Sequence, residues 1–301
     1  MFGVTILGNN SALPAFDRHP TAQIVTLNEQ LFLIDCGEGT QMQIAKYRIR
    51  TGKINYILIS HLHGDHYFGL IGFLTSMSLL NREKPIHLFA PKALEAIIQL
   101  QLNVANTNLS YPLIFHPIEQ EGVLFQHHQF TIEAFATKHR IECWGFKIYE
   151  KKLPRKINKE KVLEFEIPMA YYEELQKGKD YINKFGITIK NEIVTIANTP
   201  AKSYAFCADT IYDETLVEKI KAVNVLYHEA TYLNADTDKA AQRFHSTTIQ
   251  AASIAKQAEV KLLLLGHFSS KYENLDEFLV EASSIFPKTA LALEGITFKI
   301  I

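Results

Sequence analysis

The sequence predicts an α/β fold, a sandwich of β-sheets covered by helices. Short runs rich in β-branched and aromatic residues, each bounded by turn or polar residues, occur near the start of the chain and again in its last third. Segments with apolar residues at helical spacing follow several of these runs. Because the two sets mirror each other, we expect two packed sheets whose strand-end loops are free to carry chemistry.

The first set alternates strands with helices. A short helix is expected over residues 40–47, where Met42 and Ala45 share one face, and a longer helix begins near His66. Another helical pattern covers residues 91–102. The expected strands are Gly3–Leu7, Ala22–Leu27, Gln30–Asp35, Tyr56–Ser60 and Ile86–Phe89.

The second set resumes after residue 192. Helices are expected over residues 213–222 and 247–258. The expected strands are Ile193–Ile196, Ser203–Ala208, Val223–Tyr227, Lys261–Leu265 and Ile296–Ile301. Since a layered α/β protein can absorb a chain of this length, we expect a single domain over residues 1–301 that carries one insertion.

Between the two sets the chain changes character. Residues 151–161 contain six basic side chains against one acid, Glu160, and residues 168–178 are aromatic and charged without clear periodicity. We therefore expect an insertion over about residues 150–192 that protrudes from the core, although composition alone favours an ordinary solvated surface. The six basic residues are Lys151, Lys152, Arg155, Lys156, Lys159 and Lys161.

Composition restricts the class of protein. The formal net charge of −1 gives no overall attraction to nucleic acid, so polyanion binding requires a local basic patch. No apolar run approaches the roughly 18 to 20 residues of a membrane-spanning helix, and the chain starts with a strand pattern rather than a signal peptide. Three widely spaced cysteines indicate neither a disulfide framework nor a cysteine zinc site. We expect a cytoplasmic protein that does not interact with membranes.

The apolar run that ends at Ser60 leads directly into a dense group of potential metal ligands. Gly64 allows the chain to turn, so that two alternating side chains face one metal ion and the next two, at a helix start, face a second. Histidine nitrogens and carboxylate oxygens suit zinc, at bond lengths of about 2.0 to 2.2 Å. Leu62 is the only apolar member, which disfavours a polar surface loop. The four ligands are His61, His63, Asp65 and His66.

Three further candidate ligands, His139, Asp209 and His267, also follow apolar strands. Each has an ordinary alternative when taken singly: a loop histidine is usually just hydrogen-bonded, and Asp209 could cap the helix near Asp213. Together they complete two coordination spheres, with His139 joining the first pair of ligands and His267 the second. Asp209 is expected to bridge, because a carboxylate has two oxygens to share.

Such a centre predicts hydrolysis of phosphodiesters. Two metal ions about 3.5 to 4 Å apart hold a hydroxide between them and neutralise the charge that grows on phosphoryl oxygens. The remaining histidines outside the motifs lack a comparable context, so we expect a structural role for them; they are His87, His116, His127 and His128.

The segment His61-Leu62-His63-Gly64-Asp65-His66 resembles the HxHxDH signature of the metallo-β-lactamase fold, an αββα sandwich. Within that superfamily the chain is similar to the short form of ribonuclease Z, the endonuclease family that matures tRNA 3′ ends. HxHxDH is specific only to the superfamily. Two segments share the resemblance to this member, Asp35–Gln41 and Ala208-Asp209-Thr210. The elements that point to it by their order and spacing are His228-Glu229-Ala230-Thr231 and His245-Ser246-Thr247.

The resemblance implies an enzyme with two zinc ions per subunit that removes the 3′ trailer from precursor tRNA. The products are a 3′ hydroxyl on the tRNA and a 5′ phosphate on the trailer. Asp65 is then both metal ligand and proton acceptor, and His245 protonates the departing ribose 3′ oxygen, which suits a side chain that can carry a proton near neutral pH. Composition alone also allows His245 to be a neighbour of a helix N-cap. Glu229 is expected to orient a histidine.

The resemblance also implies a protruding arm that grips tRNA, and a homodimer in which one subunit's arm holds tRNA for the other's metal site. The basic insertion lies in the corresponding interval, between His139 and Asp209, and its cations are expected to contact backbone phosphates without base specificity. It is less glycine-rich than the family arm. The loop Gly8–His19 resembles a family loop near the cleavage site but departs from it at Asn9 and His19, which leaves the preferred tRNA end open.

Three other functions agree less well with the sequence. A two-zinc hydrolase of small phosphodiesters or thioesters uses the same ligands, although the insertion and the His228–Thr231 element argue against it. Binding of tRNA without cleavage is disfavoured by the complete ligand set. Redox chemistry at iron is disfavoured because the related di-iron proteins place a glutamate at the position of His63.

Overall fold

The computed structural model describes all residues from Met1 to Ile301 and divides the chain into two compact units. The main unit contains Met1–Tyr149 and Lys202–Ile301, and the insertion contains Glu150–Ala201. None of the helices combines the length and the low polarity that a bilayer-spanning helix needs.

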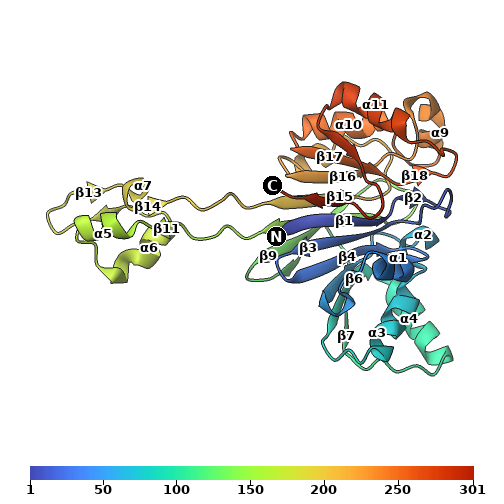
Figure 1. Ribbon diagram of the computed structural model, residues 1–301, viewed down its shortest axis with the longest axis horizontal. Helices are drawn as coiled ribbons and strands as arrows, with labels where there is room; N and C mark the ends of the chain where they lie inside the picture. Colours follow the sequence, from blue (N-terminus) through green and yellow to red (C-terminus); the bar gives the residue numbers. More distant parts are fainter. The chain divides into compact units, whose positions relative to one another are not determined.

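The first sheet of the main unit has seven strands (Figure 1). In spatial order they are β20 (Thr297–Lys299), β1 (Phe2–Gly8), β3 (Ala22–Leu27), β4 (Gln30–Cys36), β5 (Ile54–Leu58), β6 (Ile86–Pro91) and β7 (Leu113–Ile118). The strands from β20 to β4 pair antiparallel, and those from β4 to β7 pair parallel. Parallel neighbours need crossover connections, which contain α1 (Thr40–Lys46), α2 (Gly64–Tyr67), α3 (Leu70–Leu79) and α4 (Ala93–Val104).

The second sheet also has seven strands. In spatial order they are β19 (Thr289–Leu291), β17 (Leu262–Gly266), β16 (Val225–Glu229), β15 (Ser203–Cys207), β10 (Trp144–Glu150), β9 (Phe130–Ala136) and β8 (Gly122–Gln126). The strands β15, β16, β17 and β19 pair parallel. Their connections contain α8 (Leu216–Lys219), α9 (Thr237–Gln242), α10 (Thr248–Gln257) and α11 (Asp276–Ile285).

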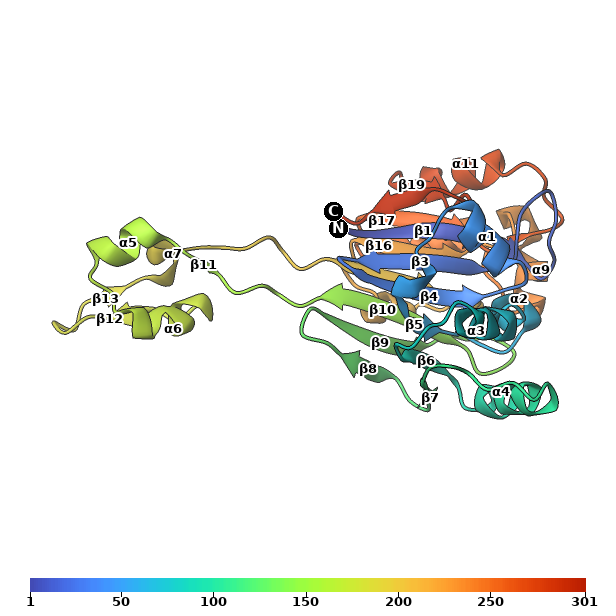
Figure 2. The same cartoon turned by 60° about the horizontal axis from the view of Figure 1, so that its bottom comes forward.

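The two sheets pack face to face and form an αββα sandwich (Figures 1 and 2). Alternate side chains of each strand point to opposite faces, so Tyr227 of β16 lies in the core between the sheets and its neighbour Leu226 lies under the helices. The helices α1, α3 and α4 cover the first sheet, and α8, α10 and α11 cover the second. The predicted fold class is confirmed.

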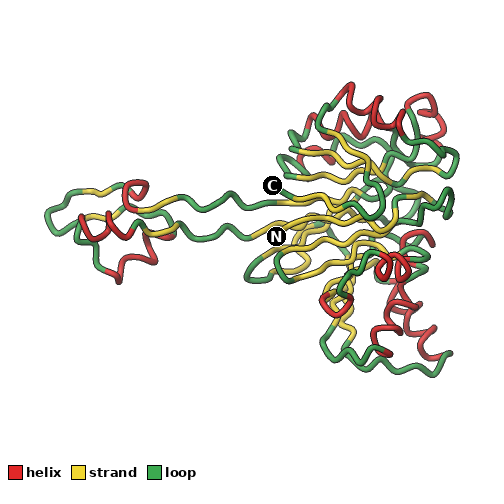
Figure 3. Tube along the Cα trace, viewed as in Figure 1, coloured by secondary structure: helices red, strands yellow, loops and turns green.

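Loops that follow strands of both sheets meet at one edge of the sandwich, beside the short parallel pair β2 (Asn10–Ser11) and β18 (Phe268–Ser269) (Figure 3). The Phe268 N–H donates to the Asn9 carbonyl, and the Ala230 N–H donates to the Gly266 carbonyl. The first bond ties the end of the second sheet to the start of the chain, and the second ties the end of β16 to the end of β17. The loops therefore have fixed backbones at the place where the sequence puts its candidate ligands.

Most expected elements of the main unit occur within two residues of their predicted ends. The long helix predicted from His66 is instead two helices, α2 and α3, separated at Phe68 and Gly69. The Gly69 N–H donates to the Cys36 carbonyl, and a Cβ at Gly69 would lie 2.2 Å from the Gly37 oxygen. The helix is interrupted because its backbone contacts the turn after β4. The helix predicted over residues 213–222 is also shorter, since only α8 forms there.

The insertion has a small core of its own. Its elements are β11 (Lys156–Ile157), α5 (Lys159–Glu164), α6 (Tyr172–Gln176), β12 (Tyr181–Ile182), β13 (Thr188–Ile189), α7 (Asn191–Val194) and β14 (Thr195–Ile196). The strand predicted over Ile193–Ile196 is therefore wrong in its first half. Val194 is helical because its side chain is buried in the insertion core, which comprises Val162, Ile167, Leu175, Ile189 and Val194.

Candidate metal centre

The loop after β5 is held in place by Asp35, the residue before the end of β4. Asp35 has a left-handed backbone with φ of 55° and is fully buried. Its carboxylate accepts a hydrogen bond from the Ser60 N–H at 2.7 Å and another from the Ser60 hydroxyl at 2.8 Å. A strained backbone conformation costs about 1–3 kcal/mol and persists where the surrounding contacts determine it. Asp35 thus fixes the point from which the candidate ligands leave the strand.

The seven candidate ligands lie together in two groups. Within each group the potential ligand atoms lie within 4.8 Å of one another. The first group is His61, His63, His139 and Asp209, and the second is Asp65, His66 and His267. Asp209, His245 and His267 form a further overlapping group.

The spacing of donor atoms suits a tetrahedral cation. In the first group His63 Nδ1 lies 3.0 Å from His61 Nε2 and 3.1 Å from His139 Nε2, and in the second His66 Nε2 lies 3.3 Å from His267 Nε2. Two ligands at zinc bond lengths around a tetrahedral ion lie about 3.4 Å apart. These residues therefore fit metal ions without rearrangement of the loops.

Asp209 lies between the two groups. Its Oδ2 is 3.6 Å from His61 Nε2, and its Oδ1 is 3.2 Å from His267 Nε2. The side chain is buried, yet Oδ1 has no hydrogen-bond partner. A buried carboxylate oxygen normally has a partner, so an unpaired one that faces two histidine nitrogens indicates a place for a cation.

The ligand histidines are oriented by hydrogen bonds from their other ring nitrogens. His66 Nδ1 donates to Asp35 at 2.7 Å, and His139 Nδ1 donates to the Phe244 carbonyl at 2.9 Å. His267 Nδ1 lies 2.9 Å from the Thr231 hydroxyl. Such contacts fix the ring and leave Nε2 free to bind a metal. Sequence reasoning did not assign roles to Asp35 or Thr231, although both lie in segments that carried the resemblance.

The pKa shifts describe a site prepared for positive charge. Burial lowers the pKa of His61, His63 and His139, which keeps these rings neutral, as metal ligands must be. Burial alone would raise the pKa of Asp209, but the surrounding histidines hold it well below its usual value. Burial opposes a charge on His66, yet the neighbouring carboxylates raise its pKa. The negative potential at this point is what a cation would balance.

His245 is paired with Glu229 at the side of the two groups. His245 Nδ1 donates to Glu229 Oε1 at 2.9 Å, which leaves Nε2 free. Burial works against a proton on this ring, but the Glu229 carboxylate and other nearby acids raise the pKa of His245 to about 9. Protonated near neutral pH, this histidine is able to act as a general acid.

Glu229 connects three loops of the second sheet. It is fully buried at the end of β16, and its carboxylate accepts hydrogen bonds from the backbone N–H groups of Thr210, Thr231 and Ser246 at 3.1, 3.0 and 3.0 Å. The three donors lie in the loops that carry Asp209, Glu229 itself and His245. One side chain therefore positions these loops relative to one another.

His267 leaves β17 with a left-handed backbone, φ 60°. The preceding Gly266 has no room for a side chain, because a Cβ there would lie 2.3 Å from the Tyr227 hydroxyl. This close approach and the strained φ together turn the imidazole of His267 toward Asp209, which is the geometry that the second group requires.

The centre opens into a cavity of about 430 Å³. Its walls include the loop that follows β1, and the Ala12 N–H of that loop donates to Asp65 Oδ2 at 2.8 Å. The same loop is anchored at its far end, where His19 Nδ1 lies 3.1 Å from Glu294 Oε2 and Arg18 donates to the Tyr272 carbonyl. A substrate that reaches Asp65 therefore contacts this loop.

The histidines assigned a structural role lie outside these groups. His87 Nδ1 and His116 Nε2 are 2.9 Å apart on β6 and β7, and both rings stack on aromatic neighbours. His127 and His128 lie in the turn between β8 and β9.

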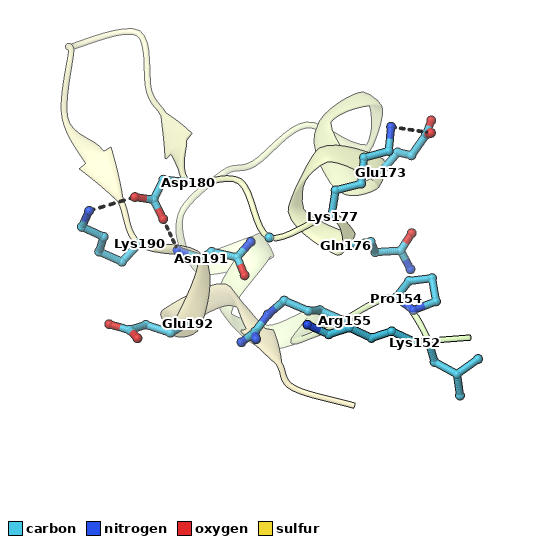
Figure 4. A pocket seen from close by; sticks show the side chains of 12 residues that line it. Lys152, Pro154, Arg155, Glu173, Gln176, Lys177, Asp180, Lys190, Asn191 and Glu192 are labelled. Carbon is cyan, nitrogen blue, oxygen red and sulfur yellow. Dashed lines mark hydrogen bonds and ion pairs between the residues drawn. The ribbon is translucent and has the colours of Figure 1, made fainter. Parts of the chain in front are cut away.

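The predicted basic residues of the insertion are spread over its surface. Lys152 and Arg155 line a depression of about 940 Å³ that Figure 4 shows, and neither has a carboxylate partner within ion-pair distance. Two other lysines at this depression are paired, Lys177 with Glu173 and Lys190 with Asp180, both at 2.8 Å. Lys151, Lys156, Lys159 and Lys161 do not line the depression.

The fold and the two donor groups define a metal-binding hydrolase of the metallo-β-lactamase fold. A Bacillus subtilis protein of that fold, YhfI, aligns over 99% of this chain with a TM-score of 0.69 and 18% identity. Ribonuclease Z of Bacteroides fragilis strain YCH46 is 40% identical over 297 residues, which are 98% of each chain, and that of Cytophaga hutchinsonii is 41% identical over 99% of this chain and 96% of its own. The chain belongs to the ribonuclease Z family.

Two further comparisons extend this assignment. The human tRNase Z, short form, aligns over 99% of both chains with a TM-score of 0.74 and 27% identity. Residues 2–155 also match the family described as Anti-Pycsar protein Apyc1, a region that ends before Asp209. The resemblance inferred from the sequence motifs is confirmed, and the protein is a nuclease.

Proposed function

We propose that this protein removes the 3′ trailer from precursor tRNA by hydrolysis, leaving a 3′ hydroxyl on the tRNA and a 5′ phosphate on the trailer. One observation carries the proposal: Asp209 faces both donor groups while His245, paired with Glu229, lies beside them. The identity of about 40% to ribonuclease Z over nearly the whole chain supports the same reaction.

The donor set favours two zinc ions. His61, His63 and His139 would hold one ion, Asp65, His66 and His267 would hold the other, and Asp209 would contact both. Zinc bound there supplies positive charge for the phosphoryl oxygens and activates water as the nucleophile. Analysis of metal content in the purified protein distinguishes zinc from iron.

Asp65 and His245 are proposed to move the protons. Burial alone would raise the pKa of Asp65, but the histidines around it hold that pKa below its usual value, so the carboxylate is ionised. The role of proton acceptor follows from the resemblance to ribonuclease Z. His245 carries a proton near neutral pH and would give it to the departing 3′ oxygen. The two groups thus provide the base and the acid that in-line hydrolysis requires.

The insertion is proposed to hold tRNA through its phosphates. Lys152 and Arg155 support this role because neither has a carboxylate partner and both line one depression, although Arg155 Nε also donates to the Thr195 hydroxyl. Less specific attraction to the tRNA phosphates would come from Lys151, Lys156, Lys159 and Lys161. Since each cation that meets a phosphate releases a counterion, we expect binding that weakens steeply with salt.

We further propose a cytoplasmic homodimer in which the insertion of one subunit holds tRNA for the metal centre of the other. Mixing two inactive variants tests this arrangement, one lacking the cations of the insertion and the other lacking Asp209. Recovery of activity in the mixture supports it, and activity no higher than that of either variant alone contradicts it.

Incubation with a 3′-extended tRNA and zinc tests the reaction, with both product ends mapped. Cleavage that leaves the stated ends supports the proposal. Absence of tRNA cleavage together with turnover of a small phosphodiester or thioester would favour a two-zinc hydrolase of small substrates instead. Asp209→Asn provides the inactive control, and Asp276→Asn, on the exposed start of α11, provides the matched control.

A further inference from the structure

The cavity at the metal centre contains two side chains to which the proposed chemistry gives no role. Phe68 lines the cavity with 65% of its surface exposed. Arg140 lines it as well, and it is the only permanently charged cation among residues that otherwise contribute the acids Glu38, Asp65 and Asp209. An exposed aromatic ring and an unpaired guanidinium beside a phosphodiester site need an explanation.

Phe68 packs against Gly64 although most of its surface is exposed. It closes α2, where its N–H donates to the Gly64 carbonyl at 2.9 Å, and its ring lies directly against Gly64. A Cβ at Gly64 would lie 2.2 Å from the ring, so only glycine allows this packing. Phe68 thus follows the candidate ligands Asp65 and His66 in the chain and lines the cavity beside them, with most of its surface exposed.

The position of Arg140 in the chain is defined by its neighbour. It directly follows His139, whose ring is fixed by the Phe244 carbonyl. Arg140 is exposed, its guanidinium has no ion-pair or hydrogen-bond partner in the structure, and its side chain lines the cavity. A polynucleotide bound in the cavity that Arg140 shares with Asp65 and Asp209 would bring a phosphate close to this guanidinium.

We propose that Phe68 and Arg140 form a nucleotide subsite next to the scissile phosphate, in which Phe68 stacks on an adjoining base and Arg140 binds an adjoining phosphate. This inference rests on the proposed cleavage of RNA. Stacking on an aromatic ring tolerates any base, and a guanidinium suits phosphate oxygens through paired N–H donors. Leu13 and Pro14 supply further apolar surface in the same cavity. The subsite accepts nucleotides of any sequence and discriminates against diesters that lack a base.

Abasic substrates test the stacking. Trailered tRNAs carry an abasic residue on either the 5′ or the 3′ side of the cleaved bond, and kcat/KM is compared for the wild type and Phe68→Ala. For the wild type we expect a loss of about 5- to 150-fold at the stacked side. On the intact substrate, kcat/KM of Phe68→Ala should be lower than that of the wild type by the same factor. For this variant, the abasic residue should cause no further decrease in kcat/KM. Phe68→Trp should retain the activity.

A merely structural role of Phe68 predicts a different result. If the ring only supports the loop at Gly64, Phe68→Ala lowers the metal content and reduces cleavage of intact and abasic substrates by equal factors, which overturns the inference. Fluorescence of 2-aminopurine at the flanking position, measured without metal, gives a second readout: quenching by the wild type that is lost in Phe68→Ala supports stacking. Val280→Ala, an exposed apolar position on α11, is the control.

A neutral phosphate tests Arg140. Arg140→Gln should reduce kcat/KM on tRNA by about tenfold and lower the salt slope by about one. A methylphosphonate at the phosphate next to the cleaved one should lower kcat/KM of the wild type by a similar factor. It should not lower kcat/KM of Arg140→Gln any further. Equal losses in both proteins overturn this assignment. If the wild type does not cut trailered tRNA, the proposed function fails; if it cuts but neither coupling is observed, only the subsite fails.

Discussion

The metal centre and the insertion use charged residues in opposite ways. In the metal centre they are buried and each contacts partners far away in the sequence, as Asp209 contacts His61 and His267. In the insertion they are exposed and mostly pair with near neighbours, as Lys161 does with Glu164. The contrast teaches that bond cleavage requires fixed geometry, whereas attraction to a polyanion needs only charge in the right region.

If this contrast holds, removal of Asp209 causes the largest decrease in kcat/KM. Asp209→Ala deletes the one carboxylate that faces both donor groups, so several kcal/mol of charge stabilisation are lost and kcat/KM falls by about 10³-fold or more. Metal content should fall in parallel. Binding of tRNA, measured by filter binding, should remain because the insertion is unchanged. Loss of binding with retained cleavage would contradict the division between the two regions.

Replacement of Glu229 has the next largest effect. Glu229→Gln keeps the size of the side chain but removes the charge that favours a proton on His245, so kcat/KM should fall by about 10- to 100-fold. In the wild type, His245 has a pKa of about 9, and the acid is therefore lost as pH rises through about 9. In the variant this alkaline decline should move to lower pH. A pH–rate profile checks the direction, with the exposed Glu277→Gln as control, and an unmoved decline would contradict the pairing.

Changes in the insertion should act on binding alone. Lys152→Ala combined with Arg155→Ala should weaken tRNA binding by about tenfold or more and reduce the salt slope by about two. Turnover of a small phosphodiester should not change, because all seven candidate metal ligands belong to the main unit. Titrations at several salt concentrations provide the measurement. A fall in small-diester turnover would show that the insertion also supports the chemistry.

Lys161 should show the smallest effect. Its ammonium group already has Glu164 as a partner at 2.7 Å on the exposed face of α5, and exposed pairs of this kind contribute little. Lys161→Ala should therefore change tRNA affinity by less than about twofold. An effect as large as that of the Lys152 and Arg155 changes would mean that total charge, rather than unpaired charge, governs binding by the insertion.

The candidate metal ligands at the ends of the strands could be predicted from the sequence. A run of four ligand-type residues after an apolar strand has few structural explanations, and the structure brings that run together with His139, Asp209 and His267. The contacts that orient these rings were not predictable, because Asp35 and Thr231 are ordinary polar residues whose roles arise only from tertiary contact. Their nearness to the ligands cannot be read from spacing.

Secondary structure was least predictable where packing overrides the local pattern. Phe68 and Gly69 continue a helical pattern, but contact with the turn after β4 interrupts the helix. Val194 belongs to an apolar run typical of a strand, but the small core of the insertion favours a helical turn. The edge strands β7 and β8 were not predicted; they are partly exposed, and each contains a residue that is rare inside strands, Pro117 in β7 and Gly122 in β8.

The hydrogen bond from Ala12 to Asp65 is protected against mutation. Its donor is a main-chain amide, so changes of side chain in this loop leave it intact. Proline alone lacks the N–H, and its ring requires φ near −65°, whereas Ala12 has φ of 61°. Side-chain substitutions in the loop can therefore leave this support of the Asp65 carboxylate in place.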